Sequence, residues 1–227
     1  MRQATLRDAL INLLFPPRCL LCGKLVRWEN TVCPACCVKS RELKAHIEPD
    51  TFGCEAVLWA ADYTGVLRRG MQSYKFRGMR QGTGFFGEML VRALREGGIP
   101  ENIDAVTYVP MPPRRERFRG YNQARLLAEY TAKTLGLPLR ENILSRKGAA
   151  TAHAADGHRE RLRLAAESYR IGKDRLPEGE RILLVDDIIT TGATVEQCAM
   201  LLRHQGAQKV WAAAPLHTPQ QGKAEKQ

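Results

Sequence analysis

The chain has 227 residues, a formal net charge of +11 and 44% hydrophobic residues. This length and apolar content allow one good hydrophobic core with a small appendage. The sequence has no long apolar run, and Arg7, Asp8 and Asn12 interrupt its apolar start, which argues against a membrane span and a signal peptide. We therefore expect a cytoplasmic protein, and its positive charge favours an anionic partner such as a nucleotide, pyrophosphate or nucleic acid.

The first 15 residues place leucines near helical spacing, and Pro16-Pro17 follows them. This pattern predicts a short amphipathic helix that ends at the prolines. Packing of the helix on the body of the protein is favoured over a role at a membrane surface or with a partner.

Two Cys-x2-Cys pairs follow, separated by ten residues: Cys19, Cys22, Cys33 and Cys36. Four thiolates at this spacing satisfy a tetrahedral Zn²⁺, and Gly23 suits the knuckle turn, where the backbone often needs positive φ. Disulfides are the alternative, but nothing marks the chain as secreted. The pattern predicts a small ribbon with a structural zinc, and Cys37 and His46 leave the fourth ligand open.

The rest of the chain alternates apolar strand patterns with helical ones. Expected strands cover 56–60, 105–109, 142–145, 182–185 and 209–214, and expected helices end near 74, 96, 136 and 206. Alternation of this kind predicts an α/β domain with a parallel sheet. We expect a ribbon region over 1–50, the α/β domain over 51–217 and a polar, disordered tail over 218–227.

Two basic segments interrupt these patterns. The first carries an aromatic ring among cations, at Lys75, Phe76, Arg77 and Arg80, and either stacks a base of a single strand or is a solvated helix end. The second has four arginines within six residues after a strand, where α/β folds bind ligands. Such a cluster needs an anion or solvent to screen its repulsion.

The stretch 181–194 carries the strongest signal in the sequence. A buried-strand pattern ends at two acids and is followed by a small-residue loop and a helix: Asp186, Asp187, Thr190, Thr191, Gly192, Ala193 and Thr194. A strand, a small-residue loop and a helix N-terminus together form an anion pocket. The plain alternative is a strand-to-helix turn with Asp187 as the helix cap, and the absence of G-K-[ST] excludes a Walker-type loop.

This stretch resembles the 5-phosphoribosyl-1-pyrophosphate (PRPP) loop of type I phosphoribosyltransferases. The resemblance implies that the two acids accept hydrogen bonds from the ribose hydroxyls, with Mg²⁺ close by. It also implies that the threonine-rich loop binds the 5-phosphate.

Further motifs widen the resemblance: Tyr-Lys-Phe-Arg-Gly at 74–78, Val-Pro-Met-Pro at 109–112 and Arg-Gly-Tyr-Asn-Gln at 119–123. Behind the double Cys pair they resemble the ComF family, phosphoribosyltransferase-like proteins with a zinc ribbon that are associated with uptake of transforming DNA. The resemblance implies a pyrophosphate loop with Arg114, Arg117, Arg119, Gly120 and Asn122. It also implies a flexible active-site loop over 146–163 with Arg146, Lys147 and Arg161.

The flexible loop departs from the family pattern, because Ala154 and Leu164 stand where relatives usually carry Gln and Asn. This departure argues against high catalytic activity. The leading hypothesis is an accessory factor of DNA uptake that binds PRPP and single-stranded DNA, with other DNA-uptake proteins as possible partners. The alternative is an active phosphoribosyltransferase that transfers the 5-phosphoribosyl group to a nucleobase and releases pyrophosphate. A PRPP-sensing regulator is the third hypothesis.

Overall fold

A computed structural model describes residues 16–76, 78–147 and 166–219. The expected N-terminal helix, Arg77, Arg161 and almost all of the expected tail lie outside these ranges. Across the described ranges, no helix combines the length and the apolar character that crossing a membrane requires.

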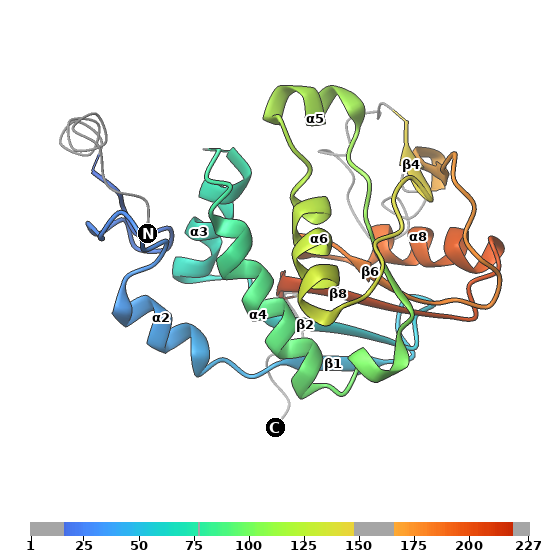
Figure 1. Ribbon diagram of the computed structural model, residues 1–227, viewed down its shortest axis with the longest axis horizontal. Helices are drawn as coiled ribbons and strands as arrows, with labels where there is room; N and C mark the ends of the chain where they lie inside the picture. Colours follow the sequence, from blue (N-terminus) through green and yellow to red (C-terminus); the bar gives the residue numbers. More distant parts are fainter. Residues whose placement is uncertain (1–15, 77, 148–165, 220–227) are drawn as a thin grey trace.

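A six-stranded sheet forms the centre of the molecule (Figure 1). Its path runs β1 (His46–Pro49), β2 (Ala56–Asp62), β8 (Lys209–His217), β6 (Arg181–Val185) and β3 (Ala105–Tyr108). The pairs are parallel except for β1 with β2, and β7 (Ile188–Ile189) adds a short parallel pair at the end of β8. The central strands β6 and β8 are apolar and buried on both faces, as expected for a parallel sheet covered on both sides. The predicted α/β class is confirmed.

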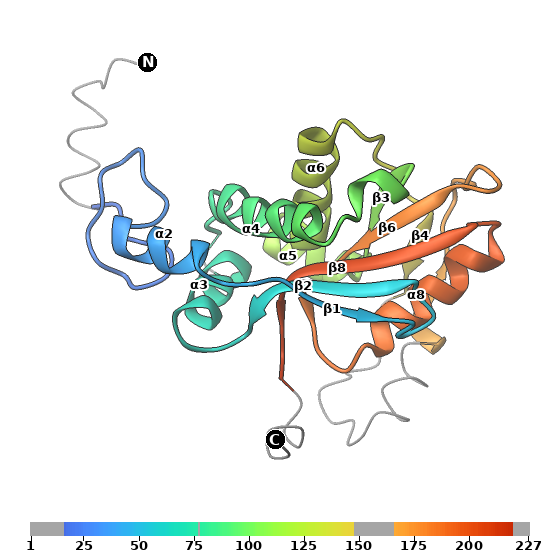
Figure 2. The same ribbon diagram turned by 90° about the horizontal axis from the view of Figure 1, so that it is seen from below.

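Helices cover both faces of the sheet (Figure 2). On one side lie α4 (Gly82–Glu96) and α6 (Gln123–Leu135), with α3 (Gly65–Phe76) packed beside α4. On the other side lies α8 (Ala193–His204), which packs against the hairpin of β4 (Leu144–Arg146) and β5 (Tyr169–Ile171). Two separate apolar cores result, one on each face.

The sequence patterns located the long elements but not the short ones. The strands β1, β5 and β7 have two to four residues each, too few for a periodic pattern to reveal. The arginine-rich segment contains α5 (Pro113–Arg119), a helix that begins with proline at its first position. Because β1 belongs to the main sheet, the boundary expected at residue 50 falls within the hairpin between β1 and β2.

The ribbon region packs against α3 and α4 at one end of the sheet (Figure 1). It contains α2 (Pro34–Arg41) and an isolated bridge between Arg18 and Leu25. Leu20 and Leu21 are buried in the core shared with α3 and α4. A Cβ atom on Gly70 of α3 would lie 2.4 Å from the Leu21 side chain, so a glycine there lets the ribbon approach the helix closely.

Candidate functional site

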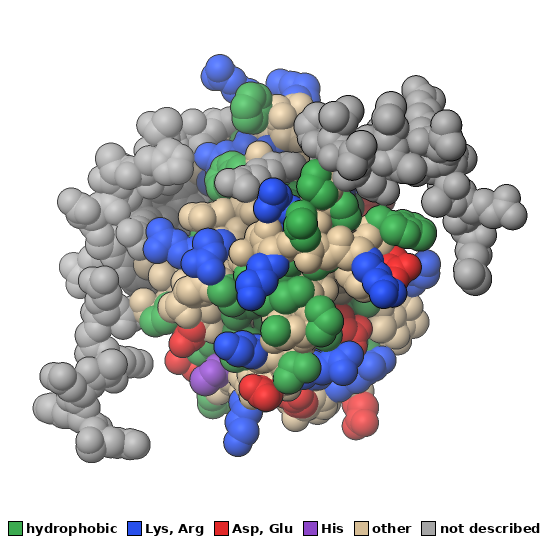
Figure 3. Space-filling view, turned by 90° about the vertical axis from the view of Figure 1, so that its left-hand side faces the viewer, with side chains coloured by type: hydrophobic (Ala, Val, Ile, Leu, Met, Phe, Trp, Pro, Cys, Tyr) green, Lys and Arg blue, Asp and Glu red, His purple; other side chains and the backbone are tan. Residues whose placement is uncertain are grey.

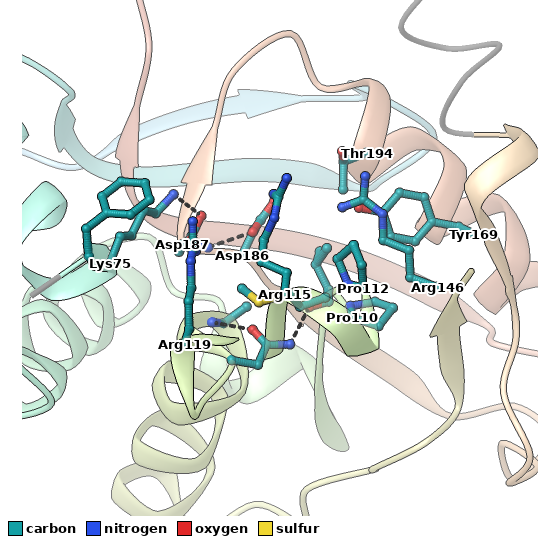
Figure 4. Close-up of a pocket in the computed structure, with 15 residues that line it drawn as sticks. Lys75, Pro110, Pro112, Arg115, Arg119, Arg146, Tyr169, Asp186, Asp187 and Thr194 are labelled. Atoms are coloured by element: carbon teal, nitrogen blue, oxygen red, sulfur yellow. Dashed lines mark hydrogen bonds and ion pairs between the residues drawn. The ribbon is translucent and has the colours of Figure 1, made fainter. Parts of the chain in front are cut away.

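A cavity of about 310 Å³ opens at the carboxyl ends of β3 and β6. Side chains from the end of α3, from α5, from the hairpin and from the segment after β6 line it (Figure 4). Parallel sheets gather ligand-binding groups at this edge, because the loops that follow neighbouring strands meet there.

The acidic pair lies at the floor of the cavity, directly after β6. The Asp186 backbone N–H donates to the Ala213 carbonyl at 3.0 Å, and the Asp187 N–H donates to Asp186 Oδ1 at 2.7 Å. Burial and the Asp187 carboxylate raise the pKa of Asp186 to about 7, while the positive charge of Lys75 opposes this shift. The Asp186 carboxyl is therefore poised to gain a cationic or hydrogen-bonding partner.

Lys75, at the end of α3, contacts the second acid. Its Nζ atom lies 2.8 Å from Asp187 Oδ1, and the two side chains are only 17% and 15% exposed (Figure 4). A charge pair so shielded from water interacts more strongly than one on an open surface. A cation from a distant helix is thus part of the site.

The small-residue loop follows β7 and leads into α8. Gly192 has φ +77° at the N-cap, and a Cβ atom there would lie 2.1 Å from the ring of Phe52, so only glycine fits. The N-cap of α8 is Gly192, which makes no side-chain capping bond, so the cap is not Asp187. The N–H groups of the first turn remain available to an anion, and Thr194 of this turn lines the cavity.

Three arginines line the cavity, and one of them, Arg119, lies against Phe76 at the end of α3. Arg115 and Arg119 lie one turn apart on α5, and Arg146 comes from β4 (Figure 4). The Arg146 guanidinium lies 4.7 Å from the ring of Tyr169. Its Nε atom is buried and has no hydrogen-bond partner within the described part of the chain. A buried, unpartnered guanidinium N–H calls for an acceptor, and an anionic ligand in the cavity would supply one.

The Arg-Gly-Tyr-Asn-Gln motif both lines the cavity, through Arg119 and Asn122, and holds its walls together. The Tyr121 hydroxyl donates to the Tyr74 carbonyl, and Gln123 Nε2 donates to the Lys75 carbonyl at 3.5 Å. Asn122 begins α6: its Oδ1 atom accepts from the N–H groups of Ala124 and Arg125, and its amide donates to the Val109 carbonyl at 3.1 Å. The motif thus connects the end of α3 with the end of β3, which fixes Lys75 in place.

The second site is the cysteine cluster of the ribbon. The sulfur atoms of Cys19, Cys22, Cys33 and Cys36 all lie within 4.8 Å of one another, and Cys22 and Cys33 are 3.7 Å apart. Thiolates bound to one tetrahedral zinc would lie roughly 3.8 Å apart, so the cluster fits this ion. The Cys33 N–H donates to Cys19 Sγ at 3.3 Å, a contact typical around zinc-bound sulfur. Cys37 and His46 are not part of the cluster, so Cys36 would be the fourth ligand.

Comparisons with known proteins agree with this two-part organisation. Residues 10–47 match the double zinc ribbon domain, and residues 126–227 match the phosphoribosyl transferase domain. The chain is 29% identical over 205 residues to the DNA utilization protein YhgH of Salmonella typhi, covering 85% of this chain and 86% of the relative. It is 32% identical over 151 residues to competence protein F of Haemophilus influenzae, covering 63% of this chain and 66% of the relative. It is 29% identical over 146 residues to competence protein ComFC of Bacillus subtilis, covering 63% and 56%.

The chain is thus similar to competence proteins and to a DNA utilization protein. The predicted resemblance is confirmed, and with it the combination of a zinc ribbon and a phosphoribosyltransferase-type domain.

The arginines that line the cavity differ from the predicted pyrophosphate set. Arg119 lines the cavity as predicted, whereas Arg114 and Arg117 are exposed and are not among the residues that line it. Arg115 takes their place, because residues four apart share a helix face and α5 turns this face towards the acids. Recognising α5 as a helix would have revealed the pair from its spacing alone.

The residues of the predicted nucleic-acid cluster do not form one open surface. Lys75 contacts Asp187 in the cavity, and Arg80 donates to the Gly120 carbonyl at 2.7 Å while lying 4.8 Å from the Tyr121 ring. Phe76 remains 67% exposed, with the Arg119 guanidinium 4.6 Å from its ring.

The remaining predicted residues lie at the rim or further away. Lys147 and Thr190 are exposed, Thr191 is half-buried, and Gly192 at the N-cap of α8 and Ala193 at its first position are buried. Tyr169 lines the cavity, and nothing in its sequence surroundings pointed to this position.

Proposed function

We propose that this protein binds PRPP with Mg²⁺ in the cavity and serves DNA uptake by handling single-stranded DNA. The observation that carries the proposal is the set of groups that line one cavity: two acids, the start of a helix whose N-cap is a glycine, and three arginines. A sugar diol needs acceptors, whereas phosphate groups need donors and positive charge. The cavity offers both kinds of group at separate positions.

In the proposed complex, Asp186 and Asp187 accept from the ribose hydroxyls, and Mg²⁺ lies near these carboxylates. The N–H groups at the start of α8, together with Thr194, hold the 5-phosphate. Arg115, Arg119 and Arg146 hold the pyrophosphate, and the unpartnered Arg146 Nε supports this assignment. The cation Mg²⁺ would neutralise charge on the pyrophosphate oxygens.

In the absence of PRPP, Lys75 occupies the site as the partner of Asp187. Its ammonium group contacts Asp187, so the carboxylate that would accept a ribose hydroxyl already has a partner. Binding of PRPP and Mg²⁺ replaces this contact, and the released ammonium group becomes a further cation for the pyrophosphate. The exchange keeps the buried carboxylate paired in both states.

The DNA part of the proposal rests on the relatives and on charge. Two relatives are competence proteins, another is a DNA utilization protein, and this chain has a net charge of +11. Phe76 and Phe118 are exposed next to arginines, a combination suited to stacked bases and a phosphate backbone.

An active phosphoribosyltransferase is the second candidate. The same acids and arginines would stabilise an oxocarbenium-like transition state and the departing pyrophosphate by fixed charge. Ground-state binding and catalysis need the same groups, so the cavity supports both candidates.

Calorimetry with PRPP and Mg²⁺ tests the shared step. We expect Mg²⁺-dependent binding that the double variant Asp186→Asn, Asp187→Asn weakens about 10-fold or more, because charge-assisted hydrogen bonds contribute about 1.5–3 kcal/mol each. Equal affinity in the double variant would remove PRPP from this site. Pyrophosphate release with a panel of nucleobase acceptors, alongside no binding of single-stranded DNA at low salt, would favour the transferase.

A further inference from the structure

Helix α3 has an apolar face and a polar face, and the polar face points away from the sheet. Leu67, Gly70, Met71 and Tyr74 are buried against α4 and the ribbon. The polar stripe consists of Arg69, Gln72, Ser73 and Phe76, at the spacing i, i+3, i+4 and i+7. It ends in an aromatic side chain, which is unusual for a merely solvated helix face.

This stripe forms one wall of a second cavity, of about 580 Å³. The other wall is the first cysteine knuckle of the ribbon, from Arg18 to Gly23. Two arginines, Arg18 and Arg69, line the cavity, and the described residues around it include no carboxylate. The lining also contains apolar side chains and two cysteines of the zinc cluster, Cys19 and Cys22, so the two arginines are the groups that would contact an anionic ligand.

Phe76 connects the two cavities, because it lines both of them. Its ring is 67% exposed, and Arg119 of the first cavity lies against it. The groove between the ribbon and α3 therefore leads to the acids and arginines of the first cavity. Figure 3 shows that Lys and Arg side chains are spread over the face that carries the ribbon, while Asp and Glu side chains lie mainly in the lower half of this view.

We propose that the groove between the ribbon and α3 binds single-stranded nucleic acid and directs it to the PRPP cavity. Arg18 and Arg69 contact phosphates of the strand, Gln72 and Ser73 supply polar contacts, and Phe76 stacks a base at the entrance to the first cavity. Recognition of this kind follows the backbone and is tolerant of sequence. The zinc ribbon then has a function besides folding, because it supplies a wall of the binding groove. This inference rests on the proposed function and specifies where the strand binds.

Fluorescence anisotropy with a labelled oligothymidylate at several salt concentrations tests the proposal. Each phosphate contact contributes roughly 0.7 to the log–log slope of affinity against salt. We expect Arg69→Gln to lower the slope by about 0.7 and Arg18→Gln with Arg69→Gln to lower it by about 1.4. The matched control is Arg95→Gln with Lys133→Gln, two exposed cations of α4 and α6 away from the groove, which should leave the slope unchanged.

Two further variants separate stacking and folding from charge. Phe76→Leu should reduce affinity about 5-fold or more with little change in slope, since base stacking contributes about 1–3 kcal/mol and is not electrostatic. Arg18 donates to the Gly23 carbonyl within the knuckle, so the zinc content of the double variant is measured as well. The single variant Arg69→Gln keeps the test valid if the ribbon of the double variant is perturbed.

The outcomes distinguish this inference from the proposed function. PRPP should bind the groove variants as it binds the wild type, because neither arginine lines the first cavity. Strand binding with slopes equal to that of the control would overturn the groove while leaving the proposed function intact. The groove would also be overturned if replacement of Arg114 and Arg117 on α5 lowered the salt dependence of strand binding and the groove variants did not. A wild-type protein that binds neither PRPP nor a single strand would instead refute the proposed function itself.

Discussion

Replacement of Asp186 by asparagine should stabilise the ligand-free protein, and the gain should grow with pH. The pKa of Asp186 is raised from 3.8 to about 7 in the folded protein, mainly by burial. Between these two values the folded state binds a proton that the unfolded state has released. The free energy of unfolding of the wild type therefore falls as pH rises from about 4 to about 7, and it is level above that.

The magnitude follows from the shift. One pKa unit corresponds to about 1.4 kcal/mol, so about three units cost the folded state up to about 4 kcal/mol at pH 8. Asparagine cannot ionise, and its Oδ1 atom can still accept the Asp187 N–H, so it removes this cost without breaking the turn. The Asp186→Asn variant should match the wild type near pH 4 and exceed it in stability at pH 8.

Urea unfolding without Mg²⁺ and PRPP measures the effect. Fluorescence of Trp59 and Trp211, both buried in the sheet, reports on the domain that contains the site. Asp62→Asn, an exposed aspartate at the end of β2, is the matched control and should show little change with pH. A gain for Asp186→Asn that is equal at pH 5 and pH 8, or a loss at pH 8, would refute the reasoning. In the same variant PRPP binding should weaken, so stability and ligand binding change in opposite directions.

Three further predictions concern single positions. Purified protein should contain about one zinc per chain. By elemental analysis, Cys36→Ser should lose this zinc and Cys37→Ser should keep it. Loss of zinc in both variants would contradict the proposed ligand set. Gly192→Ala should destabilise the protein by more than about 1 kcal/mol in urea unfolding, because alanine is strained at φ +77° and its methyl group would collide with the Phe52 ring. A variant as stable as the wild type would show that the turn can rearrange without cost. Arg146→Gln should weaken pyrophosphate binding in calorimetry by about 10-fold, because a charge-assisted hydrogen bond contributes about 1.5–3 kcal/mol. An unchanged affinity would show that this arginine does not bind the anion.

The sequence alone determined those features that depend on neighbouring residues. The apolar run that becomes β6 stops at Asp186 and Asp187 because charged side chains cannot continue a strand buried on both faces. Gly192 marked the turn before α8, and Asn122 marked the start of α6, because positive φ and N-cap hydrogen bonds restrict the residue type locally. The cysteine spacing indicated the metal site for the same reason, since each pair forms its own knuckle.

Tertiary structure decided which side chains meet in the cavity. Lys75 lies more than a hundred positions before Asp187 in the chain, and the two meet only because α3 packs beside the end of β6. The contacts of Tyr121 and Gln123 with the end of α3 likewise join segments far apart in the sequence, so no local pattern could show that these residues support the helix. Arg115 rather than Arg114 lines the cavity, because the packing of the short helix α5 on the rest of the protein determines which of its faces turns towards the acids. Periodicity states which residues share a face, but only the packing of one element on another determines what that face contacts.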